Sequence, residues 1–396
     1  MRGFKTIKKQ PTQSQSQPQP QYEIADILNK LGSKLEDLGL NSWQLRTLFA
    51  LKKCRTSALG GHIDACDECG NISISYNSCR NRHCPKCQGR NREDWIQTRE
   101  TELLPVPYFH VVFTLPEVLN KTALHEPKML YDILFESAWE TLQTFGKNKN
   151  LQMGMIAVLH TWGQNLSLHP HLHCIVPGGG VDENGAWKNI KNDGKFLFSV
   201  KALSKVFRAK FCEKLKANLK DKFNENQENE YGKIRQSLWE KDWVVFAKKP
   251  FGSPKSVVEY LGRYTHKIAI SNGRIRGIDD KTVTFDYKDY RQKGIKKQMV
   301  LSHEEFIRRF AMHILPKRFV KIRHYGFLSS TWKRIKLKNL QQKLGIQPKE
   351  KPIKKPFSPK CSCCKVGNLV TIATFDLRGP PRWFLERSQS LKLPKI

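Results

Sequence analysis

The sequence of 396 residues lacks an apolar run long enough to cross a membrane, and it lacks an apolar segment near its start. A transmembrane helix needs about 20 consecutive apolar residues, and an export signal needs an apolar core of at least about 7. Here the first five residues, Met1 to Lys5, lead into a glutamine-rich stretch. We therefore expect a cytoplasmic protein without a membrane partner.

Acidic residues are also scarce. The chain has 36 Asp and Glu against 69 Lys and Arg, which gives a net charge of +33 and a pI of about 9.8. A soluble surface rarely needs so large an imbalance, whereas an extended basic surface attracts polyanions. We therefore expect a nucleic acid as the partner.

The chain has no internal repeat, and it is not disordered as a whole because hydrophobic residues make up 39% of it. A chain of this length and composition can fill two or three cores. Residues 9–21 alternate Gln, Pro and Ser and cannot bury apolar area. We therefore predict that residues 1–21 form a disordered tail.

Hydrophobic spacing predicts a mixture of helices and strands. We expect the strands at 153–161 and 169–176 to pair through a turn near Gly163. Past Ile346 the chain is rich in Lys and Pro, and apart from residues 361–376 we expect it to be loose. The predicted helices cover 22–53, 91–104, 117–145, 199–239 and 302–314, and a further one starts near Pro254. The predicted strands cover 106–115, 153–161, 169–176, 243–247, 268–270, 274–278 and 281–287.

Cysteines predict a zinc site. Eleven cysteines in a chain without an export signal favour reduced thiolates over disulfides. Two C-x2-C pairs can bring four thiolates to one tetrahedral zinc ion, whereas two buried structural pairs are the alternative. The spacing leaves open an exchanged ligand or a second zinc. The predicted ligands are Cys66, Cys69, Cys84 and Cys87, and the surplus candidates are Cys79, His83, Cys54 and His62.

Zinc held by four thiolates has no open position for a substrate, so we expect a structural role. The site would present the basic residues Arg80, Arg82 and Lys86 to DNA phosphates. Three further thiolates, Cys361, Cys363 and Cys364, are candidates for another zinc. We expect Cys174 and Cys212 to be core residues.

Histidines predict a second, open metal site. His171 and His173 are two apart on a predicted strand, so both imidazoles lie on one face. Two neutral imidazoles leave positions open on a divalent cation such as Mg2+ or Mn2+, which would take phosphate oxygens and water. Gln164 is our preferred third ligand, and His160 is the competing choice. His169 shares the face but lies beside a proline.

Two tyrosines, Tyr260 and Tyr264, are one helical turn apart and project from one face of a predicted helix. A core stripe of aromatic residues would show the same spacing. Next to a metal site, however, a phenol can attack a phosphodiester and leave a 5′-phosphotyrosine and a free 3′-OH. Arg263 and Lys267 flank the tyrosines and are candidates for holding adjacent DNA phosphates, although solvation explains them equally well.

Four segments resemble one known family. They are SCRNRHCPKCQ at 78–88, LLPVPYFHVVFTLP at 103–116, HPHLH at 169–173 and YLGRYTH at 260–266. Together they resemble the two-tyrosine HUH (histidine–hydrophobic–histidine) transposases of rolling-circle insertion sequences, the insertion sequence ninety-one family. The resemblance covers residues 48–329.

This resemblance implies an α+β fold in which helices flank an HUH endonuclease-like antiparallel sheet, with an N-terminal zinc-binding domain. The chain then divides into the tail, a helical and zinc-binding DNA-binding domain at 22–104, an HUH nuclease domain at 105–330 and a basic extension at 331–396. By this resemblance His171 and His173 are the metal ligands, Tyr260 and Tyr264 are the nucleophiles, and residues 66–87 belong to the zinc-binding domain. Their implied activity is metal-dependent cleavage of single-stranded DNA at element ends and transfer of the strand to target DNA, with host replication proteins as further candidate partners.

Two alternatives remain. A replication initiator or plasmid relaxase would make the same nick, but the helicase of larger relatives requires a G-x-x-x-x-G-K-[ST] loop, which the sequence lacks. A zinc-dependent DNA-binding regulator would use the histidines and tyrosines only as core residues.

Overall fold

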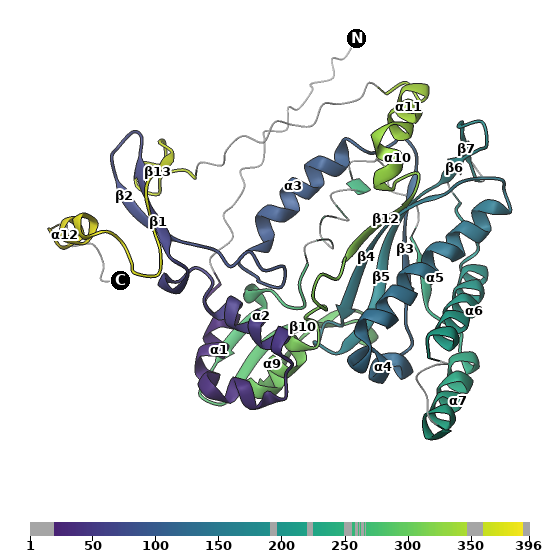
Figure 1. Cartoon of the computed structure of the whole chain (residues 1–396), viewed down its shortest axis with the longest axis horizontal. Helices are drawn as coiled ribbons and strands as arrows, with labels where there is room; N and C mark the ends of the chain where they lie inside the picture. The colour runs from purple at the N-terminus through teal and green to yellow at the C-terminus, as the bar shows by residue number, and fades with distance from the viewer. Residues whose placement is uncertain are drawn as a thin grey trace, which may run out of the picture.

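The computed structural model describes residues 20–190, 196–219, 225–248, 256–257, 260, 262, 265, 267–346 and 359–390. Within these ranges the protein is a mixture of helices and antiparallel sheets (Figure 1). Three sheets organise it: a central one of five strands and two smaller ones of three strands each. A two-stranded hairpin of β6 (Gly179–Val181) and β7 (Trp187–Asn189) extends the central part.

The central sheet has the strand order β12-β4-β5-β3-β8, and all its neighbours are antiparallel. The longest strands, β4 and β5, occupy interior positions, and most of their residues are buried, as in a sheet covered on both faces. The strands are β3 (Tyr108–Thr114), β4 (Gly154–Trp162), β5 (Leu168–Pro177), β8 (Val245–Ala247) and β12 (Ile322–Gly326).

Helices cover one face of this sheet (Figure 1). Odd-numbered residues of β3 and β4, such as Val111 and Leu159, and even-numbered residues of β5, such as Leu172, all belong to one buried cluster. This alternation is what the two-residue period of a strand requires. The covering helices are α4 (Asn120–His125), α5 (Pro127–Lys147), α6 (Val200–Leu219) and α7 (Glu225–Glu240).

The opposite face carries a separate, smaller core and the polar residues discussed below. Tyr108, Ile156, Val158 and Ile175 project from the strands into this core, where Val257 joins them. Because His110, His160, His171 and His173 share the parity of these residues, they lie on the same face. The core also receives residues from α3 (Gln88–Glu100), α10 (Ser330–Arg334) and α11 (Lys336–Lys343).

The second sheet has the order β11-β10-β9 and packs against helices from both halves of the chain. Asn41 caps α2, because its side chain accepts a hydrogen bond from the Gln44 amide, and Ser302 caps α9 by accepting from the Glu305 amide. The elements are β9 (Ile275–Ile278), β10 (Thr282–Asp289), β11 (Ile295–Ser302), α1 (Ile24–Leu31), α2 (Ser42–Lys52) and α9 (His303–Ala311).

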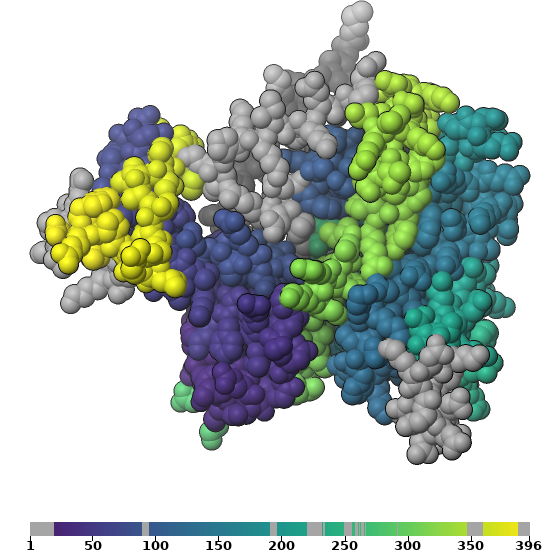
Figure 2. Space-filling view, in the orientation of Figure 1, coloured from purple at the N-terminus to yellow at the C-terminus, as the bar shows by residue number. Residues whose placement is uncertain are grey.

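The third sheet joins the two ends of the described chain. Its order is β13-β1-β2, in which β1 (Gly61–Cys66) pairs with both β2 (Ile72–Tyr76) and β13 (Leu369–Phe375). We call these three strands and their connecting loops the ribbon. Figure 2 shows the C-terminal residues in yellow packed against the blue N-terminal strands at one side of the molecule. Helix α12 (Arg382–Ser390) follows β13.

The sequence predicts the elements around the histidines well but misses several strands. The predicted strands at 106–115, 153–161 and 169–176 correspond to β3, β4 and β5. The expected strand at 268–270 is absent, and β11 takes its place in the second sheet. Strand β12 and the β6–β7 hairpin were not predicted. Within the described part of the chain, no helix has the length and apolar character needed to cross a membrane.

Candidate active site and cysteine clusters

Three histidines meet near the ends of β4 and β5. In the strand register His160 of β4 lies opposite His171 of β5, and His173 is two residues farther along the same face. One ligand nitrogen from each of His160, His171 and His173 lies within 4.8 Å of the others, and we call these three residues the histidine cluster. Because it lies on an interior pair of strands, the backbone that carries it is held on both sides.

Hydrogen bonds orient the two ligands predicted from sequence. The Nδ1 of His171 lies 2.6 Å from the carbonyl oxygen of His169, to which it donates, so a neutral His171 presents the lone pair of Nε2. That Nε2 is 3.2 Å from the Nε2 of His173. Ligand nitrogens about 2.1 Å from a cation and at right angles to each other would be roughly 3 Å apart. The spacing therefore fits a shared metal ion.

His110 on β3 links this cluster to a tyrosine. Its Nε2 is 2.8 Å from Nδ1 of His173, and its Nδ1 is 3.5 Å from the Oη of Tyr260. Lys248, just beyond β8, places its Nζ 5.4 Å from the centre of the Tyr260 ring. The sequence offers His110 as part of a wall of the site, and its alternation with Tyr108 on β3 places it on the same face as the histidine pair.

Burial keeps these imidazoles neutral. It lowers the pKa of His171 to about 4, and burial together with Lys248 lowers the pKa of His110 to about 4. The pKa of His173 falls well below its usual value for the same reason, with smaller contributions from His171 and His110. Neutral imidazole is the form that binds metals. The site is therefore ready to accept a cation at neutral pH.

Of the two candidates for a third ligand, Gln164 and His160, the structure places His160 beside the histidine pair. Gln164 lies beyond the end of β4 in the turn that leads to β5, and its backbone carbonyl accepts a hydrogen bond from Arg274. His160 instead lies directly opposite His171, with ring centres 5.4 Å apart. The strand register, which sequence spacing alone does not fix, brings His160 to this position. His169 is exposed and lies outside the cluster.

Tyr260 is half-buried and, like the buried Val257 and Thr265, has a helical conformation. The second predicted nucleophile, Tyr264, and the predicted phosphate ligand Arg263 lie outside the described residues. Lys267 is exposed beside the site, and its carbonyl accepts a hydrogen bond from Nζ of Lys321.

The other basic residues predicted to contact DNA separate into two kinds. Arg80 is exposed, as a phosphate contact would need. Arg82 is half-buried, and its guanidinium donates to the carbonyl oxygens of Pro316 and Phe319, so its role as a DNA contact is corrected to a structural one. Lys86 is similarly engaged, because it forms an ion pair with Glu23 and donates to the Cys54 carbonyl.

The first cysteine cluster consists of Cys54, Cys79, Cys84 and Cys87. The sulfur of Cys54 lies 3.5 Å from that of Cys84 and 3.6 Å from that of Cys87, and the Cys79 and Cys87 sulfurs are 3.7 Å apart. Four sulfurs about 2.3 Å from a tetrahedral zinc would be about 3.8 Å from each other. The cluster therefore has the dimensions of a zinc site.

The second cysteine cluster consists of Cys66, Cys69, Cys361 and Cys364. The single site predicted from the two N-terminal C-x2-C pairs is therefore wrong in its grouping, because the structure divides those pairs between two clusters. Strand β1 carries Cys66 away from Cys84, and β13 brings the C-terminal pair to it. His83, a surplus candidate, is not a ligand in either group, since its Nε2 accepts the Leu315 amide hydrogen 3.3 Å away.

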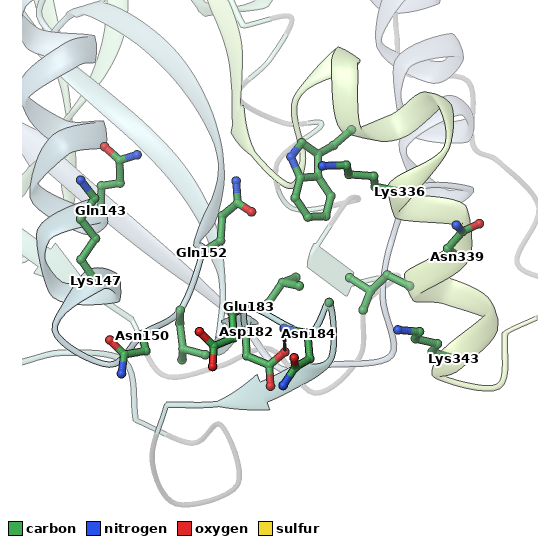
Figure 3. A pocket seen from close by; sticks show the side chains of 15 residues that line it. Gln143, Lys147, Asn150, Gln152, Asp182, Glu183, Asn184, Lys336, Asn339 and Lys343 are labelled. Carbon is green, nitrogen blue, oxygen red and sulfur yellow. Dashed lines mark hydrogen bonds between the residues drawn. The ribbon is translucent and has the colours of Figure 1, made fainter.

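A cavity of about 1030 Å³ lies at the opposite end of the central sheet (Figure 3). Its lining includes Gln152, and His160 lies eight residues farther along the chain, roughly 26 Å if the strand is extended. Lys147, Lys336 and Lys343 line it together with Asp182 and Glu183, so both charge signs are present. The cavity is thus separate from the histidines.

Comparison with known proteins assigns the chain to a family. A family model described as "Putative transposase" matches residues 154–335, which include the histidine cluster and Tyr260. A second, described as "Transposase zinc-binding domain", matches residues 27–115, which include the whole first cysteine cluster and half of the second. The cysteine-rich N-terminal region is therefore a zinc-binding region. No solved structure matches this chain.

Two transposases are similar along most of the chain. The "Putative transposase y4qJ" of Sinorhizobium fredii (strain NBRC 101917 / NGR234) is 42% identical over 388 residues, which cover 91% of this chain and 97% of that protein. The "Transposase for insertion sequence element IS801" of Pseudomonas savastanoi pv. phaseolicola is 29% identical over 306 residues, covering 75% and 73%. This protein is a member of the insertion sequence ninety-one (IS91) family of transposases.

Proposed function

We propose that this transposase cuts single-stranded DNA at the ends of its element through a 5′-phosphotyrosine and transfers the strand to a target. The observation that carries the proposal is the chain of contacts from Tyr260 to the histidine cluster: 3.5 Å from Tyr260 Oη to His110, and 2.8 Å from His110 to His173. A tyrosine that served only the core would not need a polar path to three converging imidazoles.

His160, His171 and His173 are the proposed ligands of the catalytic cation, Mg2+ or Mn2+, and their geometry suits an HUH-type sheet. When bound, such a cation polarises the scissile phosphodiester. Three neutral imidazoles leave its charge uncompensated, which favours a phosphate oxygen as an additional ligand.

The hydrogen-bond chain then has a defined direction. If Nε2 of His173 is a ligand, its proton is on Nδ1 and is donated to Nε2 of His110. His110 consequently carries its own proton on Nδ1, which faces the Tyr260 oxygen. In this state His110 is a donor that stabilises negative charge on the attacking phenol oxygen.

Attack forms the bond from Tyr260 Oη to phosphorus and breaks the bond from phosphorus to O3′. The phenol loses one proton and the released O3′ gains one, so the step needs no nucleotide or external oxidant. The phosphotyrosine retains the bond energy of the phosphodiester, and the 3′-OH of the target strand can reverse the reaction. Tyr264 is the proposed second nucleophile, which would permit two covalent intermediates.

The zinc-binding region and the basic residues outside the histidine cluster are proposed to hold the DNA. Arg80 is the proposed phosphate contact of the first cysteine cluster, and Lys267 and Arg263 are those nearest the tyrosines. The net charge of +33 supplies the general attraction for DNA. We propose residues 22–104 as the DNA-binding part and residues 105–330 as the nuclease part.

The test uses labelled single-stranded oligonucleotides that carry the DNA flanking the coding region. The protein is incubated with them and Mg2+ or Mn2+, and adducts that survive denaturation are counted. We expect an adduct from the wild type, none from the Tyr260→Phe, Tyr264→Phe double variant, and none in chelator. Tyr290→Phe, at an exposed phenol on another part of the molecule, is the matched control and should leave the yield unchanged.

Adding an unlabelled acceptor strand separates the alternatives. Strand transfer to the acceptor supports transposition, whereas an adduct without transfer would support a nicking enzyme of the initiator type. Specific DNA binding with no adduct under any metal would support the non-catalytic DNA-binding alternative and overturn the proposal.

A further inference from the structure

The second cysteine cluster joins parts of the chain that are far apart in sequence. Cys66 is the last residue of β1 and Cys69 follows that strand, whereas Cys361 and Cys364 precede β13. The Cys66 and Cys364 sulfurs are 3.6 Å apart, and those of Cys69 and Cys361 are 3.8 Å apart. These spacings are close to the edge of about 3.8 Å expected for a zinc tetrathiolate and far from the 2.0 Å or so of a disulfide.

We propose that Cys66, Cys69, Cys361 and Cys364 bind a second structural zinc ion, which clamps the C-terminal segment 359–390 onto the N-terminal zinc-binding region. This site is distinct from the first cysteine cluster, and two of its four ligands lie outside the residues matched by the zinc-binding family model. It does not depend on the proposed cleavage chemistry.

Each half of the cluster has the local geometry of a metal-binding turn. The amide of Cys69 donates to the sulfur of Cys66 at 3.5 Å, and the amide of Gly367 donates to the sulfur of Cys364 at 3.3 Å. Amide donors stabilise thiolates, which are the form that binds zinc. Both turns are therefore prepared for a cation.

The two turns also fit closely against each other. A Cβ at Gly367 would lie 2.4 Å from the Cys66 sulfur and 2.7 Å from the Asp67 carboxylate, so glycine is needed for this approach. The Asp67 carboxylate accepts hydrogen bonds from the backbone amide and the side chain of Asn368. These contacts join residues 301 positions apart in the chain, which indicates that the fold holds the two turns together as one site.

The ribbon has little else to hold it together. None of the described residues in β1, β2 or β13 belongs to the three main hydrophobic clusters of the protein. Ile63 is its buried apolar residue on β1, and the buried Asp64 accepts hydrogen bonds from Ser75 and Thr371. A small sheet with so little apolar burial depends on a metal or another cross-link for its stability. A zinc ion at the second cysteine cluster would provide this cross-link.

Zinc stoichiometry tests the proposal directly. Metal analysis and native mass spectrometry of protein purified under reducing conditions should find two zinc ions per chain. The Cys361→Ser, Cys364→Ser double variant should retain one. Cys363→Ser is the matched control because this exposed cysteine lies between the two ligands and outside the cluster, and it should retain two. One zinc in the wild type, or two in the double variant, would overturn the proposal.

A cleavage experiment covers the case in which the double variant folds poorly. A protease recognition sequence is inserted after Ile346 in the full-length protein, which is cut under reducing conditions and passed over a sizing column. We expect the C-terminal fragment to remain bound when zinc is present and to be released by a chelator, and the Cys363→Ser fragment to behave identically. Release from zinc-loaded protein, or retention in chelator, would contradict the clamp.

Discussion

His110 Nε2 lies 2.8 Å from His173 Nδ1, between a tyrosine and a candidate metal ligand. His110 is buried on the central sheet, and the neighbouring strand fixes its position opposite Ile175. In the proposed mechanism this contact couples metal binding to activation of the phenol.

The first prediction concerns this contact. We expect His110→Ala to reduce both Mn2+ affinity and the yield of covalent adduct, by about 10-fold to 100-fold, because partners of metal ligands orient them and raise their basicity. His110→Gln, which can still accept from His173, should recover part of the Mn2+ affinity. Titration of Mn2+ by electron paramagnetic resonance measures it. His125→Ala, at an exposed histidine on α4, is the control, and an equal loss there would refute the role of His110.

The second prediction distinguishes the two candidates for the third metal ligand. His160→Ala should lower Mn2+ affinity by at least about tenfold, since it removes a ligand rather than a ligand's partner. Gln164→Ala should have little effect, because Gln164 lies in the turn beyond β4. The same titration compares them. A larger loss in the Gln164 variant would restore glutamine as the ligand.

The third prediction separates two neighbouring arginines. Arg82→Lys loses the paired donation to Pro316 and Phe319, so we expect the free energy of unfolding to fall by about 2 kcal/mol. Arg80→Ala should leave stability unchanged but reduce the slope of DNA affinity against salt by roughly 1. Urea denaturation and salt-dependent binding measure the two effects. If Arg80→Ala instead destabilises the fold and leaves the salt slope unchanged, Arg80 is a structural residue and not a DNA contact.

The fourth prediction concerns the pH dependence of stability. Burial, and secondarily Arg82, lowers the pKa of Lys321 to about 7, whereas an unfolded lysine titrates near 10.4. Between these values the unfolded chain binds more protons, so stability contributed by this residue rises with pH. Because part of Lys321 is exposed, we expect the free energy of unfolding to change by about 2 kcal/mol over this pH range, which is less than the full pKa shift implies.

Comparison with Lys321→Met isolates this effect from other titrating groups. The free energy of unfolding of the variant should exceed that of the wild type by the largest amount at pH 6.5. This difference should shrink as the pH rises to 9.5. Denaturant unfolding at several pH values measures it. A difference that stays constant with pH would show that Lys321 remains charged in the folded protein.

The sequence predicts the part of the candidate site that depends on residues close together in the chain. His171 and His173 share a face because of strand alternation, and the turn near Gly163 brings β4 next to β5. The choice between His160 and Gln164 depended on register, which a bulge between His160 and Trp162 alters. Local spacing cannot reveal such a shift.

Long-range pairing explains the remaining errors. The C-x2-C pairs were assigned to each other because they are close in sequence, yet strand pairing brings Cys66 to Cys364 instead. Arg82 and Arg80 look equivalent in the sequence, and only the position of the 316–319 carbonyls makes one of them structural. Strand β12 was missed since Arg323 and His324 interrupt its apolar pattern.

Pairing of β1 with β13 also sets an order of events during protein synthesis. The middle strand of the ribbon leaves the ribosome about 300 residues before its partner, so one of its edges stays open until β13 has been synthesised. A polypeptide truncated by an early stop codon can never close that edge. Copies of the gene interrupted before β13 would thus yield products prone to aggregate or to be degraded, and only translation through β13 yields a closed ribbon.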